Sequence, residues 1–249
     1  MRFDKCRILS GNALKIIAAL SMLLDHVGLM FFPQHVIFRY LGRLAFPIFS
    51  FMIAEGCRYT RNKIRYFLSV FLLGALCQSV YFIYDGSMYL NVLITFSIAI
   101  LVIYSLELFK RCLFSKKCSA ALKVASGILF VSAVAGTYLL NRYLTIDYGF
   151  FGCMLPVFAS LFHIKCEGAP QSLKKLDRNL TAVCSMATGI LCLALVSAPR
   201  AYFSFFAVPL LLLYSGKRGR LKMKYFFYVF YPLHLVALEG VAMLLQTVK

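Results

Sequence analysis

About nine apolar stretches follow one another along this chain of 249 residues, each long enough or nearly long enough to cross a bilayer as a helix. A transmembrane helix needs about 20 mainly apolar residues, and its backbone polar groups must be satisfied within the protein. Charged residues make up 14% of the chain, well below the roughly 25% of an average soluble domain. The sequence therefore predicts an all-α, polytopic integral membrane bundle of about nine transmembrane helices, forming a single transmembrane domain over residues 1–249.

The predicted spans are bounded by proline and by basic loops. The first runs from about Ala13 to Phe32 and ends at Pro33. The second begins near Arg39 and ends before the basic loop that starts at Arg58. Two of the others, 150–162 and 202–214, are short for a bilayer crossing. The remaining spans are predicted at 66–84, 91–109, 122–140, 180–196 and 225–245.

The 27 Lys and Arg residues give a net charge of +18, which in a soluble protein would suggest a nucleic-acid partner. Here they alternate between loops, and with nine spans all but five fall on one side. That asymmetry is typical of the cytoplasmic side of a membrane protein. It predicts a multi-pass cell-membrane protein with a cytoplasmic N-terminus and an outer C-terminus, with the lipid bilayer as partner and no nucleic acid. The five exceptions are Arg39, Arg43, Arg142, Arg200 and Lys249.

Nine cysteines occur without a CxxC pair, and several lie in loops predicted to be cytoplasmic, where disulfides are rare. We expect them to be reduced. The first apolar stretch contains Asp25 and His26 and has no small-residue cleavage site, so we expect this helix to stay in the mature protein. The cysteines in the basic loops are Cys6, Cys112, Cys118 and Cys166.

Ionisable side chains concentrate in the stretch from Leu14 to Arg65, inside or beside the first two spans. They are Asp25, His26, Arg39, Arg43 and Glu55. Such side chains are costly at membrane depth, so a functional site is the default interpretation. Asp25 and His26 are adjacent and point about 100° apart on a helix, so each needs a partner of its own.

A purely structural interpretation of these residues is also open. Arg39 and Arg43 are four apart and share a helix face, and either could satisfy the Asp25 carboxylate. Glu55 could pair with Arg58 or Tyr59 at the interface.

His26 is predicted roughly 20 Å from the inner end of its span, and His234, which follows Pro232, roughly 14 Å deep. Two intramembrane histidines beside an Arg pair and carboxylates suit a reaction that needs a general base in a partly dry cavity, although a lone histidine is more often a packing residue. The four histidines show no metal-ligand spacing. The sequence also lacks a glycine-rich phosphate loop and a nucleophile elbow.

Five ordered blocks of sequence carry a family resemblance. They are LKIIAALSMLLDHVG, FRYLGRLAFPIFSFMIAEGCRYTR, LNVLITFSIAI, DYGFFGCMLPVF and FYPLHL. Together they resemble the TraX family of membrane proteins, whose named member acetylates the amino terminus of F pilin. The resemblance covers most of the chain and is densest from Leu14 to Arg61. The opening is also distantly similar to the wider transmembrane acyltransferases.

The resemblance implies an enzyme that transfers an acetyl group from cytoplasmic acetyl-CoA to an outer acceptor, a pilin-like amino terminus or a glycan hydroxyl. It implies His26, with Asp25 and His234, as the catalytic group. Arg39 and Arg43 would hold the site and stabilise an oxyanion, while cations near the inner face would bind the CoA phosphates. Those cations are Arg58, Arg61, Lys63 and Arg65, and Arg39 and Arg43 are also assigned to cofactor binding. The residues assigned to the substrate are Glu55, Asp147 and Tyr148.

Two other classes of protein remain open at this point. A proton-coupled transporter could use Asp25, His26, Glu55 and His234 as a relay, but it is expected to show inverted repeats, and the sequence shows none. An assembly factor would use the charged residues only to pair with one another.

Overall fold

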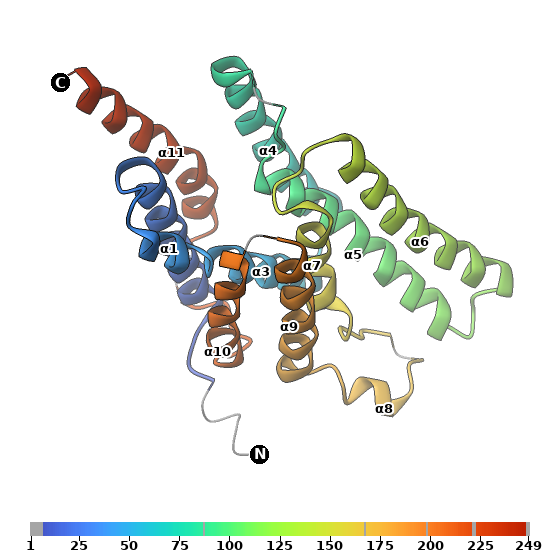
Figure 1. The fold of residues 1–249 in the computed structure, drawn as a ribbon. Helices are drawn as coiled ribbons and strands as arrows, with labels where there is room; N and C mark the ends of the chain where they lie inside the picture. The colour runs from blue at the N-terminus through green and yellow to red at the C-terminus, as the bar shows by residue number, and fades with distance from the viewer. Residues whose placement is uncertain (1–6, 87, 167, 198, 221–222, 248–249) are drawn as a thin grey trace. The chain divides into compact units, whose positions relative to one another are not determined.

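The computed structural model describes residues 7–86, 88–166, 168–197, 199–220 and 223–247. These residues form helices and loops, with two isolated backbone bridges and no strand among them. The helices, labelled in Figure 1, are α1 (Gly11–Phe31), α2 (Val36–Gly42), α3 (Ala45–Tyr59), α4 (Lys63–Asp85), α5 (Val92–Phe114), α6 (Ala120–Tyr143), α7 (Gly149–Ser160), α8 (Gln171–Lys174), α9 (Asn179–Val196), the 3-10 helix η2 (Pro199–Phe206), α10 (Ala207–Leu212) and α11 (Lys224–Thr247).

The chain is a multi-pass membrane protein. Among the described residues, seven helical segments are long and apolar enough to cross a membrane. Two shorter apolar segments, Gly149–Ser160 and Pro199–Leu212, stand where the sequence predicts two short spans. The predicted all-α polytopic bundle is confirmed, with seven long apolar segments and two short ones among the described residues.

The second predicted span is a broken helix. Its halves, α2 and α3, are separated by a turn at Arg43 and Leu44. Pro47 lies in the first turn of α3, where a missing N–H costs little because that group has no partner within the helix. The break therefore precedes the proline and sets Arg43 at the end of α2.

By its contacts the chain divides into two compact units, 1–52 with 194–249 and 53–193. The prediction of a single transmembrane domain stays a prediction. All eight cysteines in the described part of the chain are free, as expected, and Cys6 lies outside the described residues.

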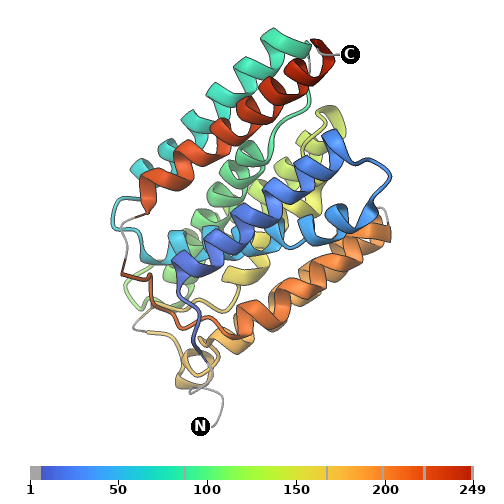
Figure 2. The same cartoon turned by 90° about the vertical axis from the view of Figure 1, so that its left-hand side faces the viewer.

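In the first unit, α1 packs against α2 and α11. Figures 1 and 2 show α1 and α11 side by side and running in the same general direction. Ser10 caps α1 by accepting a hydrogen bond from Ala13 N. The two backbone N–H groups between Ser10 and Ala13, those of Gly11 and Asn12, donate to the carbonyls of Lys217 and Arg218. The loop before α11 thereby fixes the start of α1.

Two glycines let α1 and α2 approach closely. A Cβ at Gly28 would lie 2.3 Å from Phe38 Cβ, and one at Gly42 would lie 2.3 Å from Asp25 Cβ. Small residues permit such close helix contacts in membranes. The close approach brings α2 directly onto the part of α1 that carries Asp25.

In the second unit, α5 contacts α4, α6 and α7. Its buried face includes Phe96, Ile100 and Ile103. At one end, Asn91 caps α5 and donates to the carbonyl of Gly74 and to Gln78 Oε1, which ties α5 to α4. The unit is therefore built around α5, and the loop from Leu161 to Arg178 follows from the end of α7.

Candidate functional site

Asp25 and Arg39 form an ion pair between α1 and α2. Arg39 Nη1 lies 2.8 Å from Asp25 Oδ2, and the two side chains are 20% and 19% exposed. The other carboxylate oxygen, Oδ1, is buried without a hydrogen-bond partner among the described residues. The predicted Asp–Arg pairing is thus present, with Arg39 as the partner and one acceptor atom left over.

Arg43, the second arginine of the predicted pair, is the C-cap residue of α2. Its Nε is buried and has no hydrogen-bond partner within the described part of the chain. A buried guanidinium N–H without an acceptor is costly. The Nε of Arg43 therefore lacks an acceptor that a bound ligand would supply.

His26 and His234 meet although 208 positions separate them in the sequence numbering. Their ring centroids lie 5.1 Å apart at an interplanar angle of 72°. Phe230 stacks on His234 from within α11, with centroids 5.1 Å apart. The structure therefore brings together the two histidines that the sequence singles out.

The same local hydrogen bond fixes both rings. Nδ1 of His26 lies 2.8 Å from the carbonyl of Met22, and Nδ1 of His234 lies 2.9 Å from that of Phe230. A carbonyl oxygen can only accept, so Nδ1 carries the proton in each ring. When the rings are neutral, each Nε2 holds a free lone pair and can take a proton. Nε2 of His234 is buried without a partner among the described residues.

We call Asp25, His26, Arg39, Arg43 and His234 the two-histidine cluster. It offers two candidate bases at Nε2, an unused N–H donor on Arg43 and an ion pair that holds α2 against α1. A base and a cationic donor are the groups that acyl transfer to an amine or hydroxyl requires. The sequence placed each of these five residues among its candidates.

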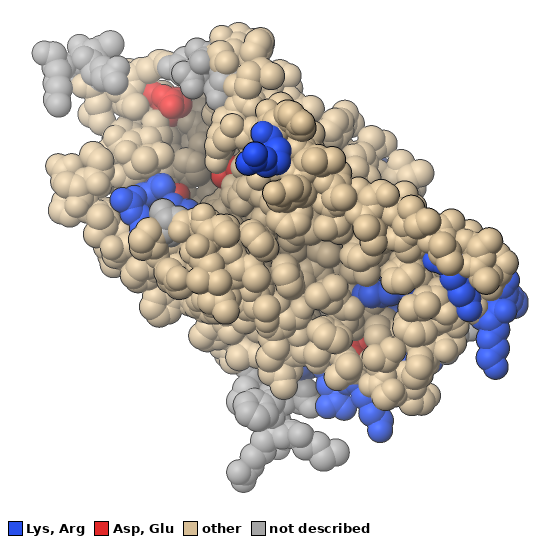
Figure 3. Space-filling model, turned by 45° about the vertical axis from the view of Figure 1, so that its right-hand side comes forward, with Lys and Arg blue, Asp and Glu red and all other residues tan. Residues whose placement is uncertain are grey.

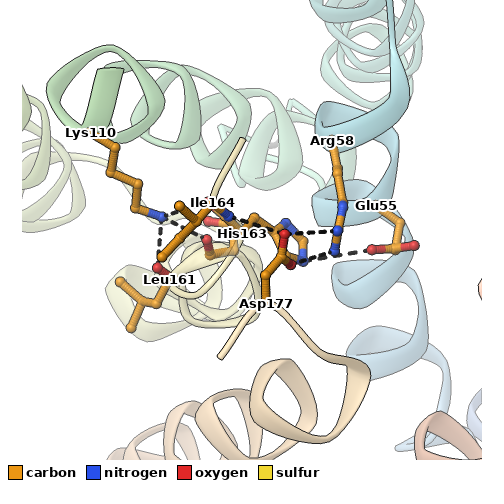
Figure 4. Close-up of polar contacts among 8 residues, drawn as sticks. Glu55, Arg58, Lys110, Leu161, His163, Ile164 and Asp177 are labelled. Atoms are coloured by element: carbon orange, nitrogen blue, oxygen red, sulfur yellow. Dashed lines mark hydrogen bonds and ion pairs between the residues drawn. The ribbon is translucent and has the colours of Figure 1, made fainter. Parts of the chain in front are cut away.

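A second polar group lies around the end of α3, and Figure 4 shows it. Arg58 Nη2 donates to Asp177 Oδ2 at 3.0 Å, and Nη1 lies 2.9 Å from Oδ1. Asp177 Oδ2 also accepts a long bond, 3.4 Å, from the backbone N–H of Ile164. One carboxylate thus ties both ends of the loop from Leu161 to Arg178 to α3.

His163 lies in that loop, 7% exposed, with Nε2 3.6 Å from Glu55 Oε1. That distance is too long for a hydrogen bond. Burial, and then the charges of Arg58, Lys110 and Lys165, lower the pKa of His163 from 6.5 to about 3. His163 is therefore neutral at pH 7, and its contact with Glu55 is not an ion pair.

Lys110, from α5, completes this group. Its ammonium donates to the carbonyls of Ser160 (3.0 Å), Leu161 (2.7 Å) and His163 (3.3 Å). These are carbonyls at and just after the C-terminus of α7, where a cation is favourable. We call Glu55, Arg58, Lys110, His163 and Asp177 the Arg58 cluster.

The other predicted binding residues lie elsewhere in the second unit. Arg61 and Arg65 are exposed at the start of α4. Asp147 accepts a hydrogen bond from Tyr89 (2.7 Å), and Tyr148, the N-cap of α7, has a left-handed φ of 61°. Asp147 and Tyr148 precede α7 whereas His163, beside Glu55, follows it. The predicted substrate residues are thus divided between the two ends of one helix.

Sequence reasoning missed three members of the Arg58 cluster, namely Lys110, His163 and Asp177. Asp177 is one of nine acidic residues in the chain, and this scarcity was a usable signal. The described residues contain no group of three or more His, Cys, Asp or Glu side chains that could hold a metal ion.

A family model described as "TraX protein" matches residues 10–242. "Probable fimbrial assembly protein FimC, serogroup H1" of Dichelobacter nodosus is 26% identical over 268 residues, covering 95% of this chain and 97% of that protein. "Uncharacterized protein RP591" of Rickettsia prowazekii (strain Madrid E) is 37% identical over 54 residues, 22% of this chain and 21% of that protein. No solved structure matches the chain.

Proposed function

Because the chain belongs to the TraX family, we propose that it is a membrane-embedded acetyltransferase. It would move an acetyl group from cytoplasmic acetyl-CoA to an amine or hydroxyl at the outer side of the membrane. The resemblance to the pilin-acetylating family supplies the reaction. The name of the Dichelobacter relative, a fimbrial assembly protein, favours a pilin-like amino terminus as the acceptor over a glycan.

The observation that carries this proposal is the pair of histidines with Nδ1 held by backbone carbonyls. One Nε2 accepts the proton that the acceptor amine or hydroxyl loses as it attacks the thioester carbonyl. The C–S bond then breaks, and the departing thiolate takes up a proton to leave as free CoA. A positioned base of this kind contributes about 10²- to 10⁴-fold to a rate.

Arg43 has the role of oxyanion donor in this proposal. Its buried Nε has no acceptor among the described residues, and a tetrahedral intermediate would provide one. Removing a single oxyanion donor typically costs about 10²- to 10³-fold in rate. Arg39 acts indirectly, because its pairing with Asp25 holds α2 in place.

In this proposal the exposed cations Arg61 and Arg65 bind the CoA phosphates. Arg58, which the sequence assigned to the same task, already has Asp177 as its partner. Opening that pair to bind phosphate would leave a carboxylate uncompensated. We therefore assign Arg58 to positioning the loop.

The test is acetyl transfer by purified protein in nanodiscs, with labelled acetyl-CoA and a peptide that carries a pilin-like amino terminus. We expect His26→Gln and His234→Gln to lower kcat about 100-fold or more. The matched control is His35→Gln, since His35 is exposed in the link between α1 and α2. Stability of the labelled product to hydroxylamine distinguishes an amide from an ester.

Full transfer by folded His26→Gln and His234→Gln proteins would remove the proposed base. Absence of transfer to peptide and glycan acceptors, together with proton uptake by sealed liposomes that carry the same protein, would favour the transporter. Binding of CoA is measured separately by calorimetry. We expect Arg61→Gln and Arg65→Gln to weaken it, and Lys116→Gln with Lys117→Gln to leave it unchanged.

A further inference from the structure

An apolar groove runs between α5 and α6 in the second unit, and none of its lining residues belongs to either polar cluster. Its volume is about 480 Å³, within the range of small-ligand pockets. Its lining is apolar apart from one cation and one hydroxyl. The lining residues are Phe109, Leu113, Lys123, Val124, Gly127, Ile128, Val131 and Ser132.

Gly127 creates the space in this groove. A Cβ at Gly127 would lie 3.2 Å from the Phe109 ring, so a larger side chain would occupy the groove itself. The outer rim faces the membrane, because Ile128 is 61% and Val131 64% exposed on a helix apolar enough to span it. The groove is therefore open to acyl chains.

The only cation in the lining, Lys123, lies in the first turns of α6. Its ammonium has no acidic partner among the described residues, and Glu107 of α5 is already paired with Lys63. Arg111, near the end of α5, and Lys116 and Lys117, in the link between α5 and α6, are exposed. Figure 3 shows a group of Lys and Arg side chains at that end of the hairpin. One end of an apolar groove thus meets a strongly positive surface.

We propose that this groove binds an anionic phospholipid. One acyl chain lies along Gly127 and Ile128, and the lipid phosphate pairs with Lys123. Basic pockets between transmembrane helices have this selectivity for anionic headgroups. A second copy of the chain is a poor occupant, because a symmetric contact here would bring two groups of like charge together.

The chain contains no tryptophan, so a single introduced tryptophan reports on its surroundings without background. Val131→Trp places the probe at the rim of the groove. Leu129→Trp is the matched control, since Leu129 is two residues away, 49% exposed and outside the lining. Each protein is reconstituted in phosphatidylcholine bilayers with rising fractions of brominated phosphatidylglycerol or brominated phosphatidylcholine.

We expect quenching at position 131 to show about a fivefold preference for phosphatidylglycerol, and quenching at position 129 to show none. Lys123→Gln should abolish the preference and Lys117→Gln should keep it. Gly127→Leu should abolish it by filling the groove, and Lys123→Gln tests the same point without altering the packing.

Equal quenching by the two lipids at position 131, or a preference that survives Lys123→Gln, overturns the proposal. Weak quenching at position 131 by both lipids also overturns it, because the groove is then covered by protein. The mass of the protein reconstituted in nanodiscs would then show whether that cover is a second copy of the chain.

Discussion

The two polar clusters of this protein contain the same kinds of residue but pair their polar atoms differently. In the two-histidine cluster, backbone carbonyls hold the Nδ1 atoms of His26 and His234 and leave Nε2 to act. In the Arg58 cluster the cations are already paired within the protein. Arg58 forms an ion pair with Asp177, and Lys110 donates hydrogen bonds to three carbonyls.

Both clusters hold an imidazole Nε2 that is buried without a hydrogen-bond partner among the described residues, on His234 and on His163. What sets the first cluster apart is its second histidine in ring contact and the buried Nε of Arg43 without an acceptor among the described residues, whereas Arg58 and Lys110 both have acceptors.

The largest effect that we expect concerns the close approach on which the first cluster depends. Gly42→Val would place side-chain atoms inside the contact with Asp25, where a Cβ alone lies 2.3 Å from Asp25 Oδ1. Overpacking of this kind typically costs about 1–3 kcal/mol and occasionally more, and the close contact here favours the upper end. We expect loss of thermal stability in detergent together with loss of acetyl transfer. Gly136→Ala is the control, because a Cβ there meets nothing within 4 Å.

The next effect separates stability from chemistry in the second cluster. Asp177→Asn leaves the Arg58 guanidinium without its carboxylate, and both side chains are mostly buried, 21% and 13% exposed. We expect a loss of about 2 kcal/mol in unfolding free energy, seen as a lower melting temperature. Acetyl transfer per folded molecule should change little. A fall in kcat comparable with that of His26→Gln would mean that the reaction takes place at the Arg58 cluster and would contradict the proposal.

A smaller effect is a pH dependence that belongs to His163. Its pKa is about 3 in the folded protein because of burial and the charges of Arg58, Lys110 and Lys165, whereas an unfolded histidine has a pKa near 6.5. The unfolded chain therefore binds the proton first, and stability is lost as the pH falls below about 6.5. We expect a loss of about 1 kcal/mol between pH 7.5 and pH 5.5.

The measurement is the melting temperature of the wild type and of His163→Gln across that range. The variant should show a flatter profile, and His35→Gln should reproduce the wild-type slope. A slope unchanged in His163→Gln would mean that another group titrates.

The smallest effect appears at the acid end of the same titration, below the range used above. Lys165 is exposed and is the last of the three cations that lower the pKa of His163. Lys165→Gln should raise that pKa slightly, since an exposed charge is well screened. The loss of stability on acidification should then level off at a slightly higher pH, in melting temperatures measured below about pH 4, and the total loss should be slightly smaller than in the wild type. A steeper fall would contradict the assigned cause.

The sequence predicted the fold class and the membership of the TraX family, and both are confirmed. It also singled out Asp25, Arg39, His26 and His234, because ionisable residues in apolar stretches stand out without any structure. The Arg58 cluster escaped prediction for a physical reason. Arg58 and Asp177 are 119 residues apart, and a loop carboxylate has no periodic pattern that could reveal its partner.

The transporter and the assembly factor differ from the proposed enzyme in what they need from His234. A relay needs a proton to pass between the two rings, and an assembly factor needs neither Nε2. The variants His26→Gln and His234→Gln therefore also test the rival functions. Both should impair a relay, and neither should impair an assembly factor.

The Lys110 ammonium has a consequence for how deeply the chain sits in the bilayer. Helix α7 has twelve residues and is about 18 Å long, which is much less than the roughly 30 Å of hydrocarbon. A helix normally has to reach the surface so that water can solvate its last carbonyls. Here an amine from a neighbouring helix takes the place of that water. The depth at which α7 ends is thus set by where α5 carries Lys110, and the thickness of the membrane no longer dictates the length of the helix.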